Sequence, residues 1–521
     1  MSKKQVLPIA VAVASVVVID DAQSALYVSE QGIGETLIYP FYSAQNGNNT
    51  LINVANASSG HKAVKVRILE AQNSQEVLDF NLYLSPEDHF SFSISATENG
   101  GAKIVTGDNS CSVPAIPTGG AEFSTLKIGG SLERTQVGYV EIIEMGQLDA
   151  DSAPIIDTQG LADASRAAIN AATAITHGGD GVPANCSILV DAWSRYSGVD
   201  GVWLAESKTT NLTGDSEFLT NWAGGGLYGY ATVINVPEGT SFGYDALAIA
   251  DHVAMGATGS AMHYEPGDIR PSLGDKALDT AAIIRVGGAA VSMDFNGDYP
   301  SEATERIQAL NATIMATEIY NDYVTDPDIA ASTDWVMTFP TKIFHVNEGT
   351  PIEPFSKLSN GQSACEPSKI GAVNREEGES AGFDSSSPIF SPAPPDPSND
   401  LLLCYESTVV QFAEKSALNA ENIVVGVNGL LDDDDGWATI SFDPSILDGV
   451  LSRCEGATIK TPCTREIDAG DGSLLGLPVV GFAVQKYVNG NVDGTGVLAN
   501  YSMASEHRSC VAGSGTTANT C

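Results

Sequence analysis

Hydrophobic and polar residues alternate with a period of two along much of the chain. In the first part of the sequence, short alternating runs are separated by turn clusters rich in Asn, Gly and Ser. The clearest of these runs lie at 51–54, 63–68, 77–84, 90–94 and 137–142. Successive side chains of a strand point to opposite faces, so this alternation is typical of strands with one buried face. It predicts an immunoglobulin-like β-sandwich over 25–150.

The pattern changes in the region 151–365. Residues 159–176 are rich in Ala and follow Asp157 and Thr158, which predicts an inserted helix, and a second helix is predicted at 301–320. Strand-like runs return at 230–236 and 335–346. We therefore expect a mixed β region with helical insertions here.

A stretch at 366–400 is rich in Ser, Pro and acidic residues. Such a composition buries too little apolar surface to fold alone, which predicts a linker or long loop. Strand patterns resume over 401–521, at 401–412, 423–427, 437–442, 479–488 and 497–503. The fold class is therefore mainly β, with helices and long loops inserted. The pattern leaves open whether the last region pairs with the first.

The N-terminus has the organisation of a signal peptide. Lys3 and Lys4 precede an apolar run at 6–19, and small residues at 22–25 offer a cleavage site. The run is too short to span a bilayer, and no later stretch is apolar enough to do so. We expect residues 1–24 to be removed and the remainder to be exported to the cell surface or extracellular space, with the periplasm as an alternative.

The chain is strongly acidic, with a formal net charge of −40. Such a charge repels the phosphates of nucleic acids and anionic lipids, so neither is an expected partner. It attracts cations, including divalent ones. A simpler interpretation is that the charge keeps an exported protein soluble.

The sequence contains an even number of cysteines, as expected of a disulfide-bonded exported protein. Their spacing favours pairs of neighbours and includes no C-x-x-C motif of a zinc or redox site. The predicted pairs are Cys111 with Cys186, Cys365 with Cys404, Cys454 with Cys463, and Cys510 with Cys521.

The sequence shows no motif of a known catalytic site. It lacks a G-x-S-x-G elbow, an H-E-x-x-H zinc motif, a phosphate-binding loop and a dinucleotide fingerprint, and its seven histidines are scattered singly. We therefore expect a protein that is not an enzyme. A hydrolase with an unrecognised site is kept as an alternative.

One acidic loop has the spacing of a calcium site. Asp294, Asn296 and Asp298 place oxygen ligands at the first, third and fifth positions, and Glu305 stands at the twelfth. Ca²⁺ binds six or more oxygens, which such a loop can supply. Tyr299 departs from the pattern, because the sixth position normally requires Gly. The alternative interpretation is a solvated turn in which Asp298 or Ser301 caps a helix.

A cluster of aromatic residues suggests a glycan-binding surface. Trp222, Tyr228 and Tyr230 lie close together in sequence, around the glycines 224–226. Exposed aromatic rings on a β-scaffold can stack on sugar rings, whereas buried rings would only fill a core. Core packing is the favoured interpretation, with glycan binding as the alternative.

Several phrases carry a resemblance to other sequences. They are GETLIYPFY at 34–42, the run from Asn48 to Pro86, DWVMTFPTK at 334–342 and LPVVGFAVQ at 477–485. In these phrases the chain resembles a group of uncharacterised exported envelope proteins of Gram-negative bacteria. The resemblance implies one integrated architecture over the mature chain and assigns no catalytic residues.

Together these features favour a secreted, acidic structural protein of the cell surface. We expect it to associate with itself into a layer or fibre with the help of divalent cations, Ca²⁺ above all. The alternative from another class is an adhesin or glycan-binding module that uses Trp222, Tyr228 and Tyr230.

Overall fold

A computed structural model describes most of the chain from Ala25 to Cys521. It leaves out 153–168, 194–202, 204–217, 220–223, 253–261, 276–279, 287–288, 300, 348–351, 358, 376–400, 428–433, 448–464, 471, 491–493, 498 and 516–520. The described part is mainly β-sheet, which confirms the predicted fold class. Its named strand pairs are antiparallel apart from β21 (Ser407–Gln411) with β22 (Val424–Gly426).

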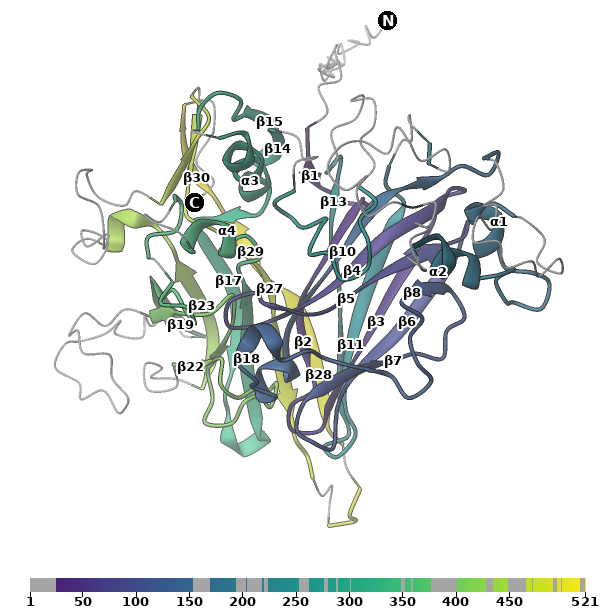
Figure 1. The fold of residues 1–521 in the computed structure, drawn as a ribbon. Helices are drawn as coiled ribbons and strands as arrows, with labels where there is room; N and C mark the ends of the chain where they lie inside the picture. Colours follow the sequence, from purple (N-terminus) through teal and green to yellow (C-terminus); the bar gives the residue numbers. More distant parts are fainter. Residues whose placement is uncertain are drawn as a thin grey trace, which may run out of the picture.

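The first sandwich consists of two sheets that enclose one hydrophobic core (Figure 1). In spatial order, the larger sheet contains β1 (Tyr27–Val28), β13 (Leu247–Ala250), β2 (Thr36–Ser43), β10 (Val137–Leu148), β4 (His61–Glu70), β5 (Glu76–Leu84) and β8 (Cys111–Val113). The smaller sheet contains β12 (Thr240–Asp245), β11 (Leu227–Asn235), β3 (Asn48–Asn56), β6 (His89–Ala96), β7 (Ala102–Val105) and β9 (Ala121–Glu122). The sandwich predicted over 25–150 is thus completed by β11, β12 and β13, which come from the following region.

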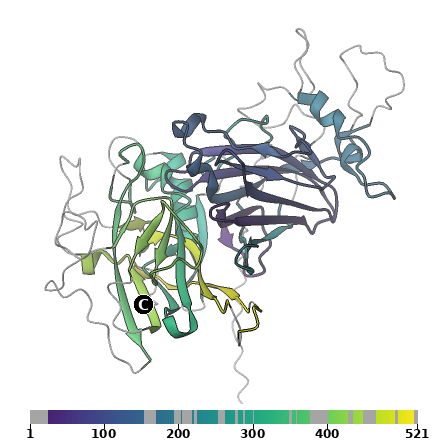
Figure 2. The ribbon, with the colours of Figure 1, turned by 90° about the horizontal axis from the view of Figure 1, so that it is seen from below.

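The second sandwich is built from the C-terminal part of the described chain. Its outer sheet contains β20 (Leu401–Leu403), β19 (Glu366–Asn374), β23 (Asp435–Ser441), β17 (Glu318–Val324) and β29 (Arg508–Cys510). Its inner sheet contains β22, β21, β18 (Ala331–Thr338), β27 (Val480–Tyr487) and β28 (Tyr501–Glu506). Figure 2 shows the two sandwiches as neighbouring lobes, one purple to blue and the other green to yellow.

Smaller elements cover the ends of the sandwiches. Near the N-terminal strand these are β14 (Ala281–Val286), β15 (Ala289–Asp294), α3 (Glu302–Thr313), β16 (Met315–Ala316), β26 (Leu477–Pro478), β24 (Glu466–Asp468), β25 (Gly472–Leu475) and β30 (Ala512–Gly515). The short helices α1 (Ala171–Ile175) and α2 (Ser187–Trp193) pack beside β8, and α4 (Ile343–Val346) follows β18.

The central strand of the inner sheet of the second sandwich, β18, is buried on both faces. Trp335 and Met337 of β18 point into the core of their own sandwich. Val336, between them, points into the core of the first sandwich, as does Phe482 of the neighbouring strand β27. The ring of Phe482 stacks on Tyr244 with centroids 4.4 Å apart. This sheet is therefore a wall that both cores share.

Three predicted elements have different boundaries in the structure. Residues 366–374 form strand β19, so the predicted linker cannot begin at 366. The helix predicted at 301–320 ends at Thr313, because the following residues pair with β26 and β23. The strand predicted at 335–346 ends at Thr338, two residues before Pro340, whose missing N–H cannot continue a ladder. In each case long-range strand pairing or a proline overrides the local pattern.

Three of the predicted disulfides are present: Cys111–Cys186, Cys365–Cys404 and Cys510–Cys521. Cys454 and Cys463 lie outside the described residues, as do the predicted signal segment and most of the helix predicted at 159–176. Among the helices that the structure describes, none has the length and apolar character needed to cross a bilayer. Bonded cysteines suit an oxidising compartment outside the cytoplasm.

The shared wall predicts a specific stability effect. In Phe482→Ala, a buried ring that contacts the first sandwich is lost, and we expect the free energy of unfolding to fall by about 3–5 kcal/mol. Urea unfolding followed by circular dichroism should still show one transition, moved to lower urea. Val236→Ala, at an exposed turn position, serves as the control and should change stability by less than about 0.5 kcal/mol. Two separate transitions, of which only one moves, would contradict the shared wall.

Candidate functional site

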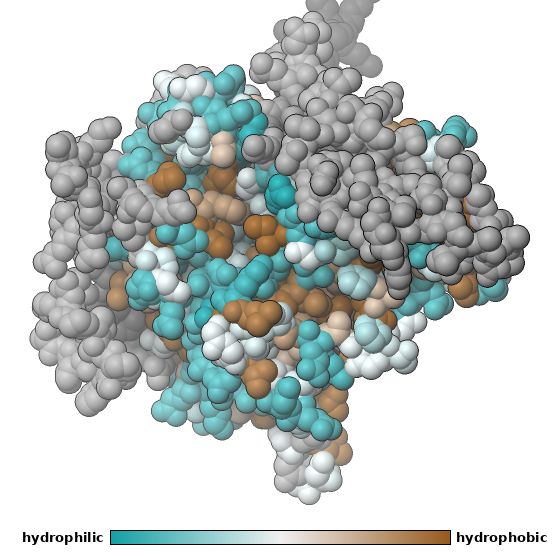
Figure 3. Space-filling model, in the orientation of Figure 1, coloured by the Kyte–Doolittle hydropathy of each residue, from teal (hydrophilic) through white to brown (hydrophobic). Residues whose placement is uncertain are grey.

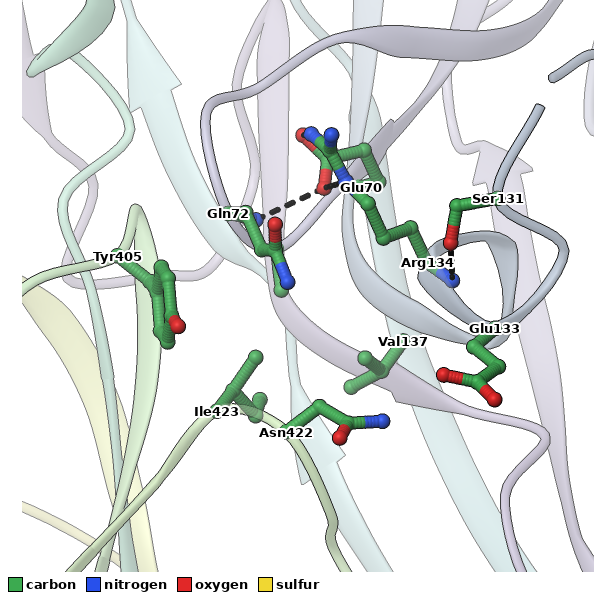
Figure 4. Close-up of a pocket in the computed structure, with 10 residues that line it drawn as sticks. Glu70, Gln72, Ser131, Glu133, Arg134, Val137, Tyr405, Asn422 and Ile423 are labelled. Atoms are coloured by element: carbon green, nitrogen blue, oxygen red, sulfur yellow. Dashed lines mark hydrogen bonds and ion pairs between the residues drawn. The ribbon is translucent and has the colours of Figure 1, made fainter. Parts of the chain in front are cut away.

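A pocket lies where the two sandwiches meet (Figure 4). Its volume is about 220 Å³. The first sandwich contributes Gln72 from the β4–β5 turn and Arg134 from a 3₁₀ turn, and the second contributes Tyr405 and Asn422. Ligand sites often occur at such junctions, so this pocket is the first candidate site.

The buried charge of this pocket is already engaged. The Glu70 carboxylate accepts hydrogen bonds from the backbone N–H groups of Gln72 at 3.0 Å and Asn73 at 2.9 Å. It accepts a third from Arg134 Nε at 2.9 Å. A carboxylate with several donors is a structural clamp for the β4–β5 turn rather than a free base. The described lining contains no histidine or cysteine.

Beside the pocket, two ionisable groups are buried at the junction. Glu406 is 2% exposed, and its backbone N–H donates to the carbonyl of Gln72 at 3.3 Å. Burial raises the pKa of the Glu406 carboxyl to about 8, and the nearby Lys342 ammonium offsets only part of this effect. Lys342 Nζ donates to three backbone carbonyls, including that of Leu403 at 3.3 Å. These contacts fix the chain that leads into β21.

The predicted calcium ligands lie in the turn between β15 and α3. Asp294 Oδ1 accepts the backbone N–H of Asn296 at 3.0 Å, and Glu305 Oε1 accepts that of Gly297 at 2.9 Å. Glu305 is thus folded back onto the loop. Among the described residues, however, the ligand atoms of Asp294, Asp298 and Glu305 do not all lie within 4.8 Å of one another.

The alternative interpretation of this loop, a turn with a helix cap, agrees with the structure at Ser301. Ser301 caps α3, because its hydroxyl accepts the backbone N–H of Thr304 at 3.2 Å. The arrangement as it stands is a capped turn, and calcium binding stays a prediction.

The structure describes two of the three residues of the predicted aromatic site. Trp222 lies outside the described residues. Tyr228 and Tyr230 are 42% and 43% exposed and occupy alternate positions of β11, so both rings project from the outer face of the smaller sheet. Same-face neighbours on a strand are about 6.7 Å apart. Core packing, the favoured interpretation from the sequence, does not apply to these two tyrosines.

Small polar residues surround the two rings on this face. Across the sheet, Tyr230 lies between Asp245 of β12 and Asn53 of β3, with Ser91 of β6 one strand further. Tyr228 stands opposite Ala55, a residue too small to cover its ring. The outer face therefore presents two aromatic surfaces among hydroxyl, amide and carboxylate groups.

The glycine between the two tyrosines is required by the core. A Cβ on Gly229 would lie 1.9 Å from the hydroxyl oxygen of Tyr39, which fills the inner side of the sheet. That hydroxyl donates to the carbonyl of Asn53 at 2.7 Å. Tyr228 and Tyr230 point outward because they alternate with Gly229 along the strand. The inward-facing position of Gly229 has no space for a side chain.

A buried ion pair fixes the start of β11. Lys62 Nζ lies 2.5 Å from Glu144 Oε1, and the other oxygen of Glu144 accepts the backbone N–H of Gly225 at 2.9 Å. Burial raises the pKa of the Glu144 carboxyl to about 7, opposed by Lys62. The pair holds the glycine segment that precedes Tyr228.

Sequence reasoning missed the buried charges of β4. The alternation at 63–68 predicted a strand with one buried face and gave no sign that Lys65 and Arg67 are buried. Lys65 Nζ donates to Asp79 at 3.0 Å and to the carbonyl of Glu265 at 3.1 Å, because the segment 262–275 covers this face. Two cations within a strongly alternating strand are a signal for acidic partners on the adjacent strands. The sequence does not indicate which segment covers them.

Comparison of the chain with models of known protein families, with curated proteins and with solved structures found no match. The resemblance to exported envelope proteins therefore stays a prediction. The function has to be argued from the chemistry of the sites themselves.

The raised pKa of Glu406 gives a testable pH dependence. The folded-state pKa of about 8 exceeds the unfolded value of about 4.3, so the folded protein keeps a proton that the unfolded chain releases. Stability from this group is lost as the pH rises from about 5 to 8. Glu406→Gln cannot ionise, so its stability relative to wild type should increase over that range, by up to about 1.4 kcal/mol per pH unit.

Urea unfolding across this pH range measures the effect. Glu133→Gln, a change at an exposed position on the rim of the same pocket, is the matched control and should show a difference that is independent of pH. A flat difference for Glu406→Gln would contradict the buried, protonated carboxyl.

Proposed function

We propose that this chain is an exported binding protein of the cell surface that holds neutral glycans on the outer face of its smaller N-terminal sheet. The observation that carries the proposal is the exposed pair Tyr228 and Tyr230 on one face of β11. Tyrosine combines an apolar ring with a polar hydroxyl, which suits contact with the alternating C–H and O–H groups of a sugar.

The neighbours of the two rings support a sugar ligand. Asn53 and Ser91 offer both donors and acceptors, and Asp245 offers a strong acceptor for hydroxyl groups. Sugar hydroxyls need both kinds of partner.

The charge of the protein restricts the class of glycan. At a formal net charge of −40, the chain repels acidic polysaccharides at long range. Neutral sugars carry no such penalty. The disulfides and the predicted export suit a protein that binds glycans outside the cytoplasm.

The double variant Tyr228→Ala/Tyr230→Ala tests this proposal on an array of neutral glycans. We expect at least one glycan bound by the wild type to lose at least about tenfold in affinity, as for removal of aromatic residues at the centre of an interface. Tyr501→Ala removes an exposed tyrosine from β28 and is the matched control, with unchanged binding expected. A double variant that binds every glycan as the wild type does would refute the proposal.

A second candidate function is self-assembly promoted by divalent cations. It is favoured by Glu305, which folds back onto the loop that carries Asp294, Asn296 and Asp298. A small rearrangement of this loop would direct several oxygens toward one cation. Ca²⁺ is the expected ion because it accepts irregular sets of oxygen ligands.

Gel filtration with Ca²⁺ and with chelator tests the assembly. We expect larger species only with Ca²⁺, and their loss in Asp298→Asn, which removes one carboxylate from the loop. Glu302→Gln is the control, because Glu302 lies on the first turn of α3, where it pairs with Arg306. A monomer in both conditions would count against cation-dependent assembly.

A further inference from the structure

The outer sheet of the second sandwich also presents aromatic rings outward. Ile370, Ala438 and Ile440 point into its core, so the alternate positions of the same strands face away from it. One row across the sheet contains Val373, Trp437 and Asp322. The next row contains Gly371, Thr439, Tyr320 and Arg508.

Trp437 is the central feature of this face. It is 43% exposed, and it is the only exposed tryptophan among the described residues. Tryptophan gains more from burial than smaller residues do, so an open ring on a sheet requires an explanation. Its centroid lies 6.3 Å from that of Tyr320, with the two ring planes at 39°. The two rings form a shallow, angled aromatic surface.

Tyr320 is fixed in place beside Trp437. Its hydroxyl donates to the carboxylate of Glu318 and lies 3.2 Å from the sulfur of Cys510, which is bonded to Cys521. A ring that is already ordered loses little conformational entropy when a ligand arrives. The C-terminal disulfide therefore helps to preorganise the aromatic surface.

One neighbour of the tryptophan is a glycine. Gly371 is diagonal to Trp437 on the neighbouring strand and carries no side chain that could cover the ring. Its own position is exposed, and a Cβ there would lie 3.1 Å from the hydroxyl oxygen of Thr439. The backbone of β19 is thus accessible next to the ring.

The rim of this face is polar. Asp322 stands opposite Trp437 and Arg508 opposite Tyr320, and both are exposed. A stable protein interface needs about 800 Å² on each partner with an apolar centre, far more than one exposed indole beside a tyrosine offers. Figure 3 shows the surface in the orientation of Figure 1, with hydrophobic residues gathered toward the middle of the molecule. An aromatic surface with hydroxyl, carboxylate and guanidinium groups at its edge matches a polyhydroxylated ring.

We infer that the outer sheet of the second sandwich carries a separate binding site for a neutral sugar, stacked on Trp437, bounded by Tyr320 and hydrogen-bonded by Asp322 and Arg508. The site shares no residue with the face around Tyr228 and Tyr230. A chain with both sites would bind one polysaccharide at two places or connect two strands of it, which raises the overall avidity.

Affinity electrophoresis in native gels that contain a soluble neutral β-glucan, α-mannan or xylan tests this site. The variant Tyr228→Ala/Tyr230→Ala is the starting background, so that only the Trp437 site remains. We expect at least one polysaccharide to retard it, and the further change Trp437→Ala to weaken that binding at least about tenfold. Trp437→Phe keeps an aromatic ring and should retain most of it. The near-ultraviolet circular dichroism spectrum and the unfolding midpoint report whether each variant is folded.

Each other outcome has a distinct meaning. Complete loss of retardation in the tyrosine variant alone would overturn the Trp437 site and leave the proposed function standing. Retardation that survives Trp437→Ala unchanged would also overturn it. A concentration-dependent dimer that disappears in Trp437→Ala would identify a protein interface instead. A wild-type protein that no polysaccharide retards would overturn both sites.

Discussion

The structure depends on one sheet whose central strand, β18, is buried on both faces. β18 directs Trp335 and Met337 into the second core and Val336 into the first, so neither sandwich has a complete core without this wall. Buried apolar area is the main source of folding free energy. Contacts such as the hydrogen bond from Thr338 to the carbonyl of Pro40 at 2.6 Å hold the wall in register with β2. The two sandwiches are therefore expected to behave as one cooperative unit.

The shared wall limits which surfaces of the two sandwiches stay exposed and could bind the proposed ligands. The second sandwich packs on the first through this sheet, while the outer faces of β11 and β23 stay exposed, and each carries exposed aromatic rings. The junction offers a pocket, but its buried carboxylate, Glu70, already accepts hydrogen bonds from the turn and from Arg134. Rigid sheets present aromatic rings at low entropic cost, which suits binding better than catalysis.

Much of the strand content could be predicted, because alternation depends only on which face of a strand is buried. The runs at 77–84 and 90–94 correspond closely to β5 and β6. The alternation pattern did not predict strand ends where both faces are buried. Strands β18 and β2 have no exposed side, so hydrophobic and polar residues do not alternate regularly along them. Of the candidate sites, the group of aromatic residues around Tyr228 and Tyr230 could be recognised in the sequence. Trp437 could not, because its neighbours Tyr320 and Gly371 lie on other strands that are distant in sequence.

The sequence by itself determined the class of fold and the three disulfides that the structure describes, whereas the exposure of Tyr228 and Tyr230 is known only from the structure. The fold class follows from side-chain period, and the disulfides follow from pairing each cysteine with its neighbour in the order of cysteines along the chain. Only the tertiary structure decided that β11 pairs with β3, a strand far upstream in the sequence, and that Lys65 is buried against Asp79. The physical reason is that a period of two tells which residues share a face. What covers that face depends on segments far away in the sequence.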